Sequence, residues 1–288
     1  MMKNLFLIYT IILITPIFSL DTMWTEYPTC KYGRLQSPIK LNEYDSTYSN
    51  SFSFVYQNYK ELNLVPVYGQ YTLIWNITDE NSGGYVNFEK EGVIKQYELI
   101  RIELYPGEHD VDGIKGNYEL HLIHKKNLNF NSNKNQYRKI VDANMFLTVV
   151  LRYTNDQTYC NQAENNCISD NGLLSDINGT SSNINIDLTK YPIYQDKRAY
   201  LYEGSFLHIP CDENVNYYII KDLFYSDFNV SLIANINTTE FNQIKEEAGR
   251  YGRPVLKNFM NYREFLEGNN LRINFFYLTL IIFILFNF

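Results

Sequence analysis

The middle of the chain consists mainly of segments in which hydrophobic and polar residues partly alternate, with many aromatic and β-branched side chains. This pattern is typical of β-strands that bury one face. The clearest such segments are residues 64–77, 85–88, 97–105 and 118–124. Residues 145–153 and 217–224 are apolar enough to predict buried strands.

Helical periodicity is scarce in this sequence. Residues 239–248, a threonine followed by glutamate-rich helix formers, are the best helix candidate. Two polar stretches, residues 127–135 and 154–182, predict surface loops or insertions. No internal repeat is evident, so the pattern indicates one mainly β (α+β) domain, which we place at residues 21–274.

Residues 1–20 have the order of a secretory signal peptide. A basic residue, Lys3, precedes the apolar run 5–13, and the small residue Ser19 stands before Asp21. This order predicts that residues 1–20 are removed in the secretory pathway, so that the mature chain begins near Asp21.

The last segment, residues 275–288, is apolar apart from Thr279 and Asn287. It is short for a membrane span, which needs about 20 residues. Small polar residues at 268–270 precede it and no basic residue follows it, as in a glycosylphosphatidylinositol (GPI) attachment signal. We therefore predict a lipid anchor on the outer face of the plasma membrane; a short retained membrane anchor is the alternative.

Secretion gives a meaning to the cysteines and to the Asn-X-Ser/Thr sequons. The chain has four cysteines and no Cys-X-X-Cys pair, which in an oxidising compartment predicts disulfides rather than a zinc site. Cys160 and Cys167 enclose only a short polar loop, which favours their pairing and leaves Cys30 for Cys211. The sequons predict glycosylation at Asn76, Asn178, Asn229 and Asn237.

Composition narrows the classes of function. The chain has 288 residues, of which 45% are hydrophobic, so it can bury a sizeable core and is neither disordered nor fibrous. Its formal net charge is −7, from 25 basic and 32 acidic residues, and no basic stripe is visible. This balance argues against nucleic acid as a partner and disfavours anionic membranes and polysaccharides.

Several separated motifs, taken together in their order and spacing, resemble the α-carbonic anhydrase family. The resemblance runs from about Trp24 to Ile273, nearly the whole mature chain. Secreted members of that family link the positions that match Cys30 and Cys211, which agrees with the pairing above. The motifs are Trp24-x-x-Tyr27-Pro28, Cys30-x-x-Gly33-x-x-Gln36-Ser37-Pro38-Ile39, Gly107-Glu108-His109-x-Val111-Asp112-Gly113, Glu119-Leu120-His121-Leu122-Ile123-His124, Tyr202-x-Gly204-Ser205, Pro210-Cys211-x-Glu213-x-Val215 and Asn261-Tyr262-Arg263.

The resemblance implies a large, twisted, mostly antiparallel sheet with short helices on its surface. It also implies a zinc site built from three histidines, two in a His-x-His on one strand and one on the next, with water in the fourth position. In this chain the positions that match the His-x-His hold Arg101 and Glu103, and only His121 remains. Arginine keeps its proton and cannot ligate a cation, so no metal is predicted.

The other positions of the family's site have also changed. The resemblance places Leu207 where the family has a threonine whose hydroxyl links the zinc-bound hydroxide to the glutamate matched by Glu108. It places Gln70 at the proton-shuttling histidine and Phe146 near the residue that lines the carbon dioxide pocket. Neither leucine nor glutamine performs the family's proton transfers at these positions.

The residues that persist have structural roles in the family. The resemblance assigns bracing roles to His109 and His124, and gives Glu119 the role of orienting His121. We hypothesise that Arg101 lies roughly where zinc would sit and bridges Glu103 and Glu119, as a polar filling of the site.

The leading prediction is a catalytically inactive, secreted, GPI-anchored and glycosylated domain that binds an extracellular protein or glycan. It resembles the carbonic anhydrase-related proteins, which lack zinc ligands and act as binding modules in receptor ectodomains or on viral surfaces that hold glycosaminoglycans. One alternative is a divergent zinc-dependent carbonate dehydratase whose site is rebuilt from Glu103, His121 and His208. Another is a structural surface-coat protein.

Overall fold

The computed structural model describes most of the middle of the chain. The described residues are 27–50, 52–68, 72–78, 84–90, 92–130, 144–160, 167–178, 184–191, 198–208, 210–227 and 254–260. The predicted signal peptide, helix 239–248 and C-terminal segment lie outside them, as do Gln70, Asn229 and Asn237. No helix among the described residues is long and apolar enough to cross a membrane.

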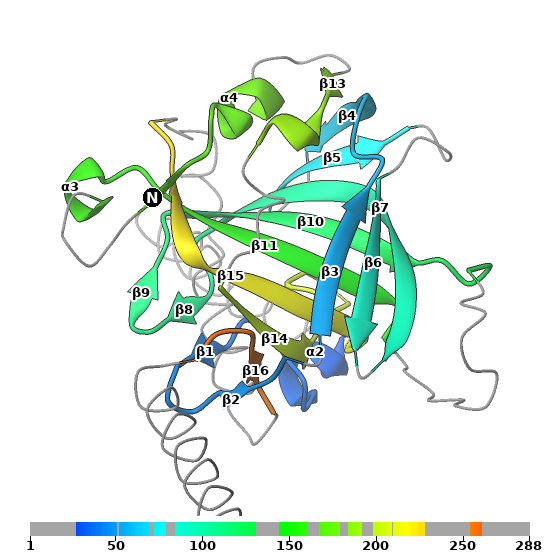
Figure 1. Ribbon diagram of the computed structural model, residues 1–288, viewed down its shortest axis with the longest axis vertical. Helices are drawn as coiled ribbons and strands as arrows, with labels where there is room; N and C mark the ends of the chain where they lie inside the picture. Colours follow the sequence, from blue (N-terminus) through cyan, green and yellow to red (C-terminus); the bar gives the residue numbers. More distant parts are fainter. Residues whose placement is uncertain are drawn as a thin grey trace, which may run out of the picture.

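One large twisted sheet dominates the fold (Figure 1). Its centre is formed by β7 (Val93–Pro106), β10 (Tyr118–Lys126), β11 (Phe146–Thr154) and β15 (Val215–Tyr225). Most neighbouring strands are antiparallel, but β11 and β15 run parallel, so the sheet is mixed. The fold class predicted from the sequence, mainly β with short helices, is confirmed.

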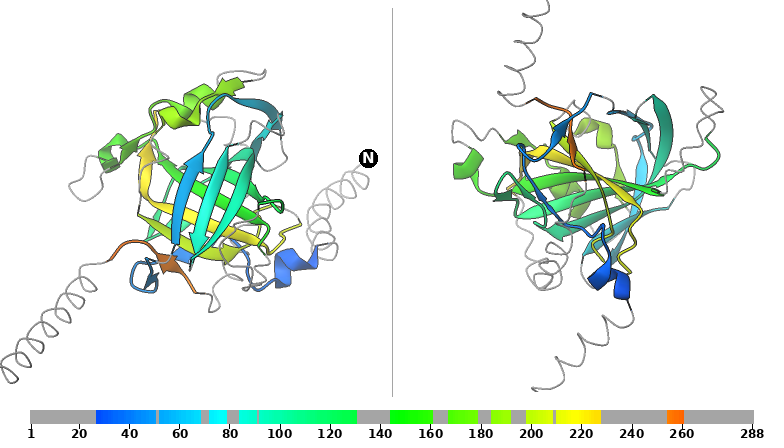
Figure 2. Two further views of the ribbon diagram at one scale, coloured as in Figure 1. Left: turned by 45° about the vertical axis from the view of Figure 1, so that its right-hand side comes forward. Right: turned by 90° about the horizontal axis from the view of Figure 1, so that it is seen from below.

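The remaining elements extend this sheet or lie at its margins (Figure 2). The other strands of the large sheet are β2 (Thr47–Tyr48), β3 (Phe52–Gln57), β4 (Leu62–Tyr68), β5 (Leu73–Ile77), β6 (Tyr85–Lys90), β12 (Ile168–Ser169), β13 (Ile184–Ile186), β14 (Ala199–Gly204) and β16 (Leu256–Lys257). A small second sheet contains β1 (Lys40–Leu41), β8 (Asp110–Val111) and β9 (Ile114–Lys115). The helices are α2 (Pro28–Tyr32), α3 (Gln157–Cys160), α4 (Leu173–Asn178) and the 3-10 turn η1 (Leu188–Lys190).

Two of the sequence-based expectations were wrong in detail. The strand expected at 64–77 is two strands, β4 and β5, which pair antiparallel with Tyr68 opposite Leu73. A short reversal leaves the alternation intact, so the pattern did not reveal it. The polar stretch 154–182 contains α3, β12 and α4, and it buries Leu173, Leu174 and Ile177 in the core. A single helical turn is too short for its apolar face to stand out in a polar region.

The two faces of the central strands are buried in different hydrophobic clusters. Successive side chains of a strand point to opposite faces, so Leu120 and Leu122 of β10 enter the larger cluster. Ile123 of the same strand and Val150 of β11 enter the smaller one. The polar residues considered below lie on the face of this smaller cluster, at positions that alternate with core leucines.

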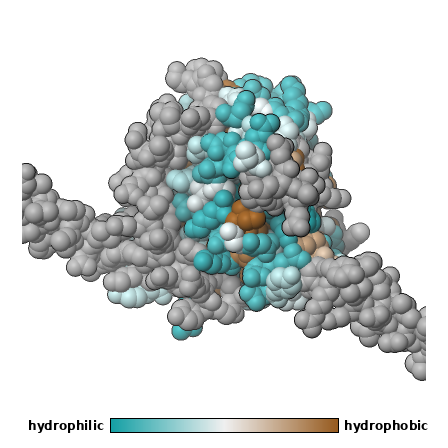
Figure 3. All heavy atoms as spheres, turned by 90° about the vertical axis from the view of Figure 1, so that its left-hand side faces the viewer, coloured by the Kyte–Doolittle hydropathy of each residue, from teal (hydrophilic) through white to brown (hydrophobic). Residues whose placement is uncertain are grey.

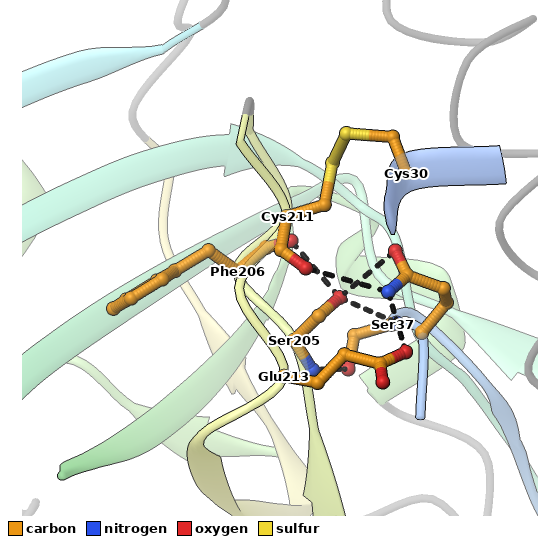
Figure 4. The surroundings of a disulfide bond; sticks show 7 residues. Cys30, Ser37, Ser205, Phe206, Cys211 and Glu213 are labelled. Atoms are coloured by element: carbon orange, nitrogen blue, oxygen red, sulfur yellow. Dashed lines mark hydrogen bonds between the residues drawn. A yellow bond between two sulfur atoms is a disulfide. The ribbon is translucent and has the colours of Figure 1, made fainter. Parts of the chain in front are cut away.

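A disulfide joins the segment around α2 to the turn that precedes β15. Cys30 pairs with Cys211 across 181 positions, and Cys160 pairs with Cys167, so both predicted disulfides are confirmed. Figure 4 shows Ser37, Ser205 and Glu213 beside the first of these bridges. The Ser205 hydroxyl accepts from Ser37 N at 3.1 Å, so the N-terminal segment is held against the end of β14.

Candidate functional site

A row of polar side chains lies on one face where β7 and β10 pair. Glu103 stands directly opposite His121 in the antiparallel register, and Tyr105 stands opposite Glu119. Arg101 lies two residues before Glu103 on the same strand, so it shares this face. Side chains directly opposite in a register are close enough to interact, which makes these five residues one cluster.

Glu119 connects the residues in the deeper half of this cluster. Its Oε2 atom lies 2.8 Å from His109 Nδ1 and 3.0 Å from His121 Nε2. Its Oε1 atom accepts the backbone N–H groups of Glu108, at 3.1 Å, and His109, at 2.6 Å. Burial alone would raise the pKa of Glu119, but the two histidines outweigh it and hold the pKa well below its usual value. Glu119 is therefore an ionised acceptor whose two oxygens are fully engaged.

His121 is neutral, and one of its ring nitrogens has no partner among the described residues. Burial lowers the pKa of its imidazole, and the bond to Glu119 offsets this only in part. Because Glu119 is an acceptor, His121 Nε2 carries the proton and donates it. The lone pair of His121 Nδ1 is thus the one metal-binding position that this residue offers.

The outer half of the cluster is an ion pair. Arg101 Nε lies 2.7 Å from Glu103 Oε1, and the Arg101 side chain is 26% exposed whereas Glu103 is 1% exposed. The two atoms are close enough for an ion pair, but their geometry is not that of a hydrogen bond. Arg101 Nη2 lies 3.1 Å from His208 Nε2, which also lies 3.6 Å from Glu103 Oε1.

The contacts of Glu103 keep it charged. Its Oε2 atom accepts the Tyr105 hydroxyl at 2.5 Å. Burial alone would raise the pKa of Glu103, but the proximity of His208 and the charge of Arg101 lower it below the usual value. The hypothesised Arg101–Glu103 pair is therefore present. Among the residues that the structure describes, the side-chain partners of Glu119 are His109 and His121, and not Arg101 as the hypothesis had it.

Aromatic residues complete the site, and two of them, Tyr105 and Phe206, were not singled out by the sequence analysis. The Arg101 guanidinium lies 5.5 Å from the centre of the Phe206 ring. Phe206 stacks on His208 with ring centres 5.4 Å apart, and Phe146 meets Phe206 edge-on at 4.9 Å. Tyr105 could have been found from its position two residues after Glu103; Phe206 could have been found only from its place before Leu207 and His208.

His109 and His124 have buried partners on opposite faces of the sheet. His109 Nε2 is hydrogen-bonded to the Tyr202 hydroxyl at 2.7 Å, so both nitrogens of this ring are engaged. His124 is hydrogen-bonded to the Tyr59 hydroxyl at 2.5 Å and to the Leu147 carbonyl at 3.1 Å. Burial lowers the pKa of His124 to about 4, so it is a neutral core residue on the other face of the sheet from Arg101.

The other predicted site residues lie in or near this region. Leu207 and Glu108 are buried, and Leu207 adjoins His208 in the chain. Asn76 of β5 is exposed and stands opposite Arg101 in the register of β5 and β7. For Asn178, the structure describes only the backbone, at the end of α4.

Within the described part of the chain, one group of three residues brings metal-binding atoms together. These are His109, Glu119 and His121, whose donor atoms all lie within 4.8 Å of one another. They are also hydrogen-bonded to each other, and His109 and Glu119 have no donor atom to spare. A zinc ion needs three protein ligands with free lone pairs, and in this arrangement only His121 Nδ1 offers one. The residues as placed do not fit zinc.

Comparison of the sequence with known proteins identifies one family. The family model described as eukaryotic-type carbonic anhydrase matches residues 20–273. Carbonic anhydrase 6 of Mus musculus is 26% identical over 278 residues, covering 87% of this chain and 82% of the mouse protein. Alpha carbonic anhydrase 8 of Arabidopsis thaliana is 22% identical over 70% of this chain, and the match spans less than half, 47%, of the plant protein.

Two solved structures share the fold. Dioscorin in complex with ascorbate has a TM-score of 0.55 and 19% identity, covering 83% of this chain and 91% of dioscorin. The alpha-carbonic anhydrase from Thermovibrio ammonificans in complex with the inhibitor sulfanilamide has a TM-score of 0.52 and 19% identity, covering 81% and 91%.

Proposed function

Because the chain belongs to the eukaryotic-type carbonic anhydrase family, we propose that it is a metal-free, inactive member that acts as an extracellular binding module. One observation carries this proposal. The Arg101–Glu103 ion pair lies on β7, directly beside His121 of the neighbouring strand β10. A guanidinium keeps its proton at any working pH, so Arg101 brings a fixed positive charge to the site and no lone pair.

The contacts within the cluster also support a metal-free, inactive site. Glu103 is engaged by Arg101, Tyr105 and His208, so it is not available as a strong zinc ligand. Leu207 has no hydroxyl with which to orient a zinc-bound hydroxide or pass its proton to Glu108. Members of this fold also serve for binding small molecules, since dioscorin has been solved in complex with ascorbate.

The proposed location is the outer face of the plasma membrane. The two disulfides support passage through the secretory pathway, because such bonds persist in oxidising compartments. The predicted lipid anchor and the glycans at the four sequons belong to the same proposal. On the face drawn in Figure 3, the described residues are mostly hydrophilic and the hydrophobic ones form only a small group. That face gives no support for a broad apolar docking surface.

Zinc stoichiometry tests the proposal. The protein would be purified from secreting cells, dialysed against trace zinc, and analysed for metal and for carbon dioxide hydration. We expect almost no zinc, no hydration and no binding of sulfonamides. About one zinc per chain with hydration activity would overturn the proposal.

A pair of variants provides a positive control for the metal assay. Arg101→His alone leaves Glu103 in place, so it is expected to restore neither zinc binding nor activity. The double variant Arg101→His with Glu103→His places two imidazoles on the face of His121 Nδ1, and it is expected to bind about one zinc. If the single variant produced carbon dioxide hydration, Glu103 would not prevent a working zinc site, and the reasoning about Glu103 would be wrong.

A divergent carbonate dehydratase is the second candidate, and one observation favours it. His208 Nε2 lies 3.6 Å from Glu103 Oε1, and Glu103 stands opposite His121, so these three residues could form an altered ligand set. This candidate predicts zinc in the wild-type protein that is lost when His208 is replaced by alanine. The metal-free proposal predicts no zinc in either protein.

A further inference from the structure

We propose that the Arg101 guanidinium anchors a small, planar monocarboxylate at this site. The inference rests on the proposed function, because it names the ligand class of a site that holds no zinc. Arg101 uses Nε for Glu103 and Nη2 for His208. Its Nη1 group has no protein partner within the part of the chain that the structure describes, and a quarter of the side chain, 26%, is exposed.

The guanidinium is held in place before any ligand arrives. Glu103 is almost fully buried and is itself fixed by the Tyr105 hydroxyl, so the Nε edge of Arg101 is pinned to the sheet. An arginine held in this way loses little side-chain freedom when it binds a ligand. Its outer edge presents N–H groups in the fork that matches the two oxygens of a carboxylate.

The charge balance selects a singly charged ligand. Glu103 lies 2.7 Å from Arg101 in an ion pair, and its other oxygen accepts the Tyr105 hydroxyl. The Arg101–Glu103 pair is therefore close to neutral, and the whole chain carries a formal charge of −7. A sulfate or phosphate group with two charges would be repelled by Glu103, whereas one carboxylate can use the donors of Arg101 without a second counter-charge.

Aromatic rings beside the guanidinium favour a planar body on the ligand. Phe206 lies against Arg101 at 5.5 Å and stacks on His208 with an angle of 11° between the rings. Phe146 supports Phe206 from its edge. A flat, conjugated ligand can place its carboxylate on Arg101 and its ring beside these side chains, since aromatic surfaces prefer stacked or edge contacts.

Benzoate is a suitable probe, with benzamide as the neutral molecule of the same shape. Isothermal titration of the full-length protein with each should show benzoate binding at least about tenfold more tightly than benzamide, a difference of about 1.4 kcal/mol. Arg101→Met should weaken the binding of benzoate by a similar factor. Lys40→Met removes an exposed lysine of β1, 54% accessible, that pairs with Asp110 and not with Arg101, and it should leave benzoate binding unchanged.

Any one of four results would overturn the inference. Equal affinity for benzoate and benzamide in the wild-type protein would overturn it, even if Arg101→Met did not fold. Unchanged benzoate binding in a folded Arg101→Met variant would overturn it as well. Zinc is measured in the same samples: zinc-dependent benzoate binding that a chelator removes would overturn the proposed function together with this inference. Absence of both zinc and benzoate binding would overturn this inference alone.

Discussion

Replacing Arg101 tests whether its ion pair with Glu103 stabilises the folded protein. In Arg101→Met the carboxylate of Glu103, 1% exposed, loses its positive partner but keeps the Tyr105 hydroxyl and His208. Breaking a buried pair by removing one partner costs about 3–5 kcal/mol. Because the Tyr105 hydroxyl still donates a hydrogen bond to Glu103, we expect the lower end, about 3 kcal/mol of unfolding free energy.

Removing the charge of Glu103 instead should cost less unfolding free energy, because Arg101 is less deeply buried than Glu103. In Glu103→Gln the Arg101 side chain is 26% exposed, so water can solvate the charge that remains. We expect a loss of about 1.5 kcal/mol. The double variant Arg101→Met with Glu103→Gln leaves no unpaired charge and should lose about 2.5 kcal/mol, which gives a coupling energy of about 2 kcal/mol.

Urea unfolding at pH 7, followed by intrinsic fluorescence with the disulfides intact, measures these free energies. Lys40→Met is the matched control, because Lys40 is 54% exposed and lies 3.8 Å from Asp110. An exposed pair of this kind should contribute less than about 1 kcal/mol. Additive losses in the double variant, or a loss in Arg101→Met no larger than in the control, would refute the reasoning.

Two further predictions concern acid stability and glycosylation. Burial lowers the pKa of His124 from 6.5 to about 4, so the unfolded chain binds its proton first and stability falls as pH drops through this window. That residue should account for a loss of about 3 kcal/mol between these values, and in His124→Gln the slope of unfolding free energy against pH should decrease by about one proton. Asn76 is exposed and stands opposite Arg101, so a glycan there would cover the anion site. Asn76→Gln should remove one glycan by mass spectrometry and tighten benzoate binding a few-fold; unchanged mass or affinity would contradict this.

Local pattern was enough to predict several features of this protein. Alternation of residue type predicted the strands that became β6, β7 and β10, because the two-residue period of a strand is a local property. The cysteine spacing predicted both disulfides. The presence of Arg101 two residues before Glu103 already placed both side chains on one face. The alternation could not reveal the reversal between β4 and β5, since it continues through both strands.

Only the tertiary structure decided which groups share the site. The register between β7 and β10 places Glu103 opposite His121. The segment between β7 and β8 places His109 against the same Glu119 oxygen that His121 contacts. His208 reaches Arg101 across 107 positions of the chain. Strand period determines which face a side chain takes, but packing of distant segments determines its neighbours. The sequence therefore determined that Arg101 could not bind a metal and predicted Glu103 as its partner, and the fold decided that His208, and not Glu119, is the second partner.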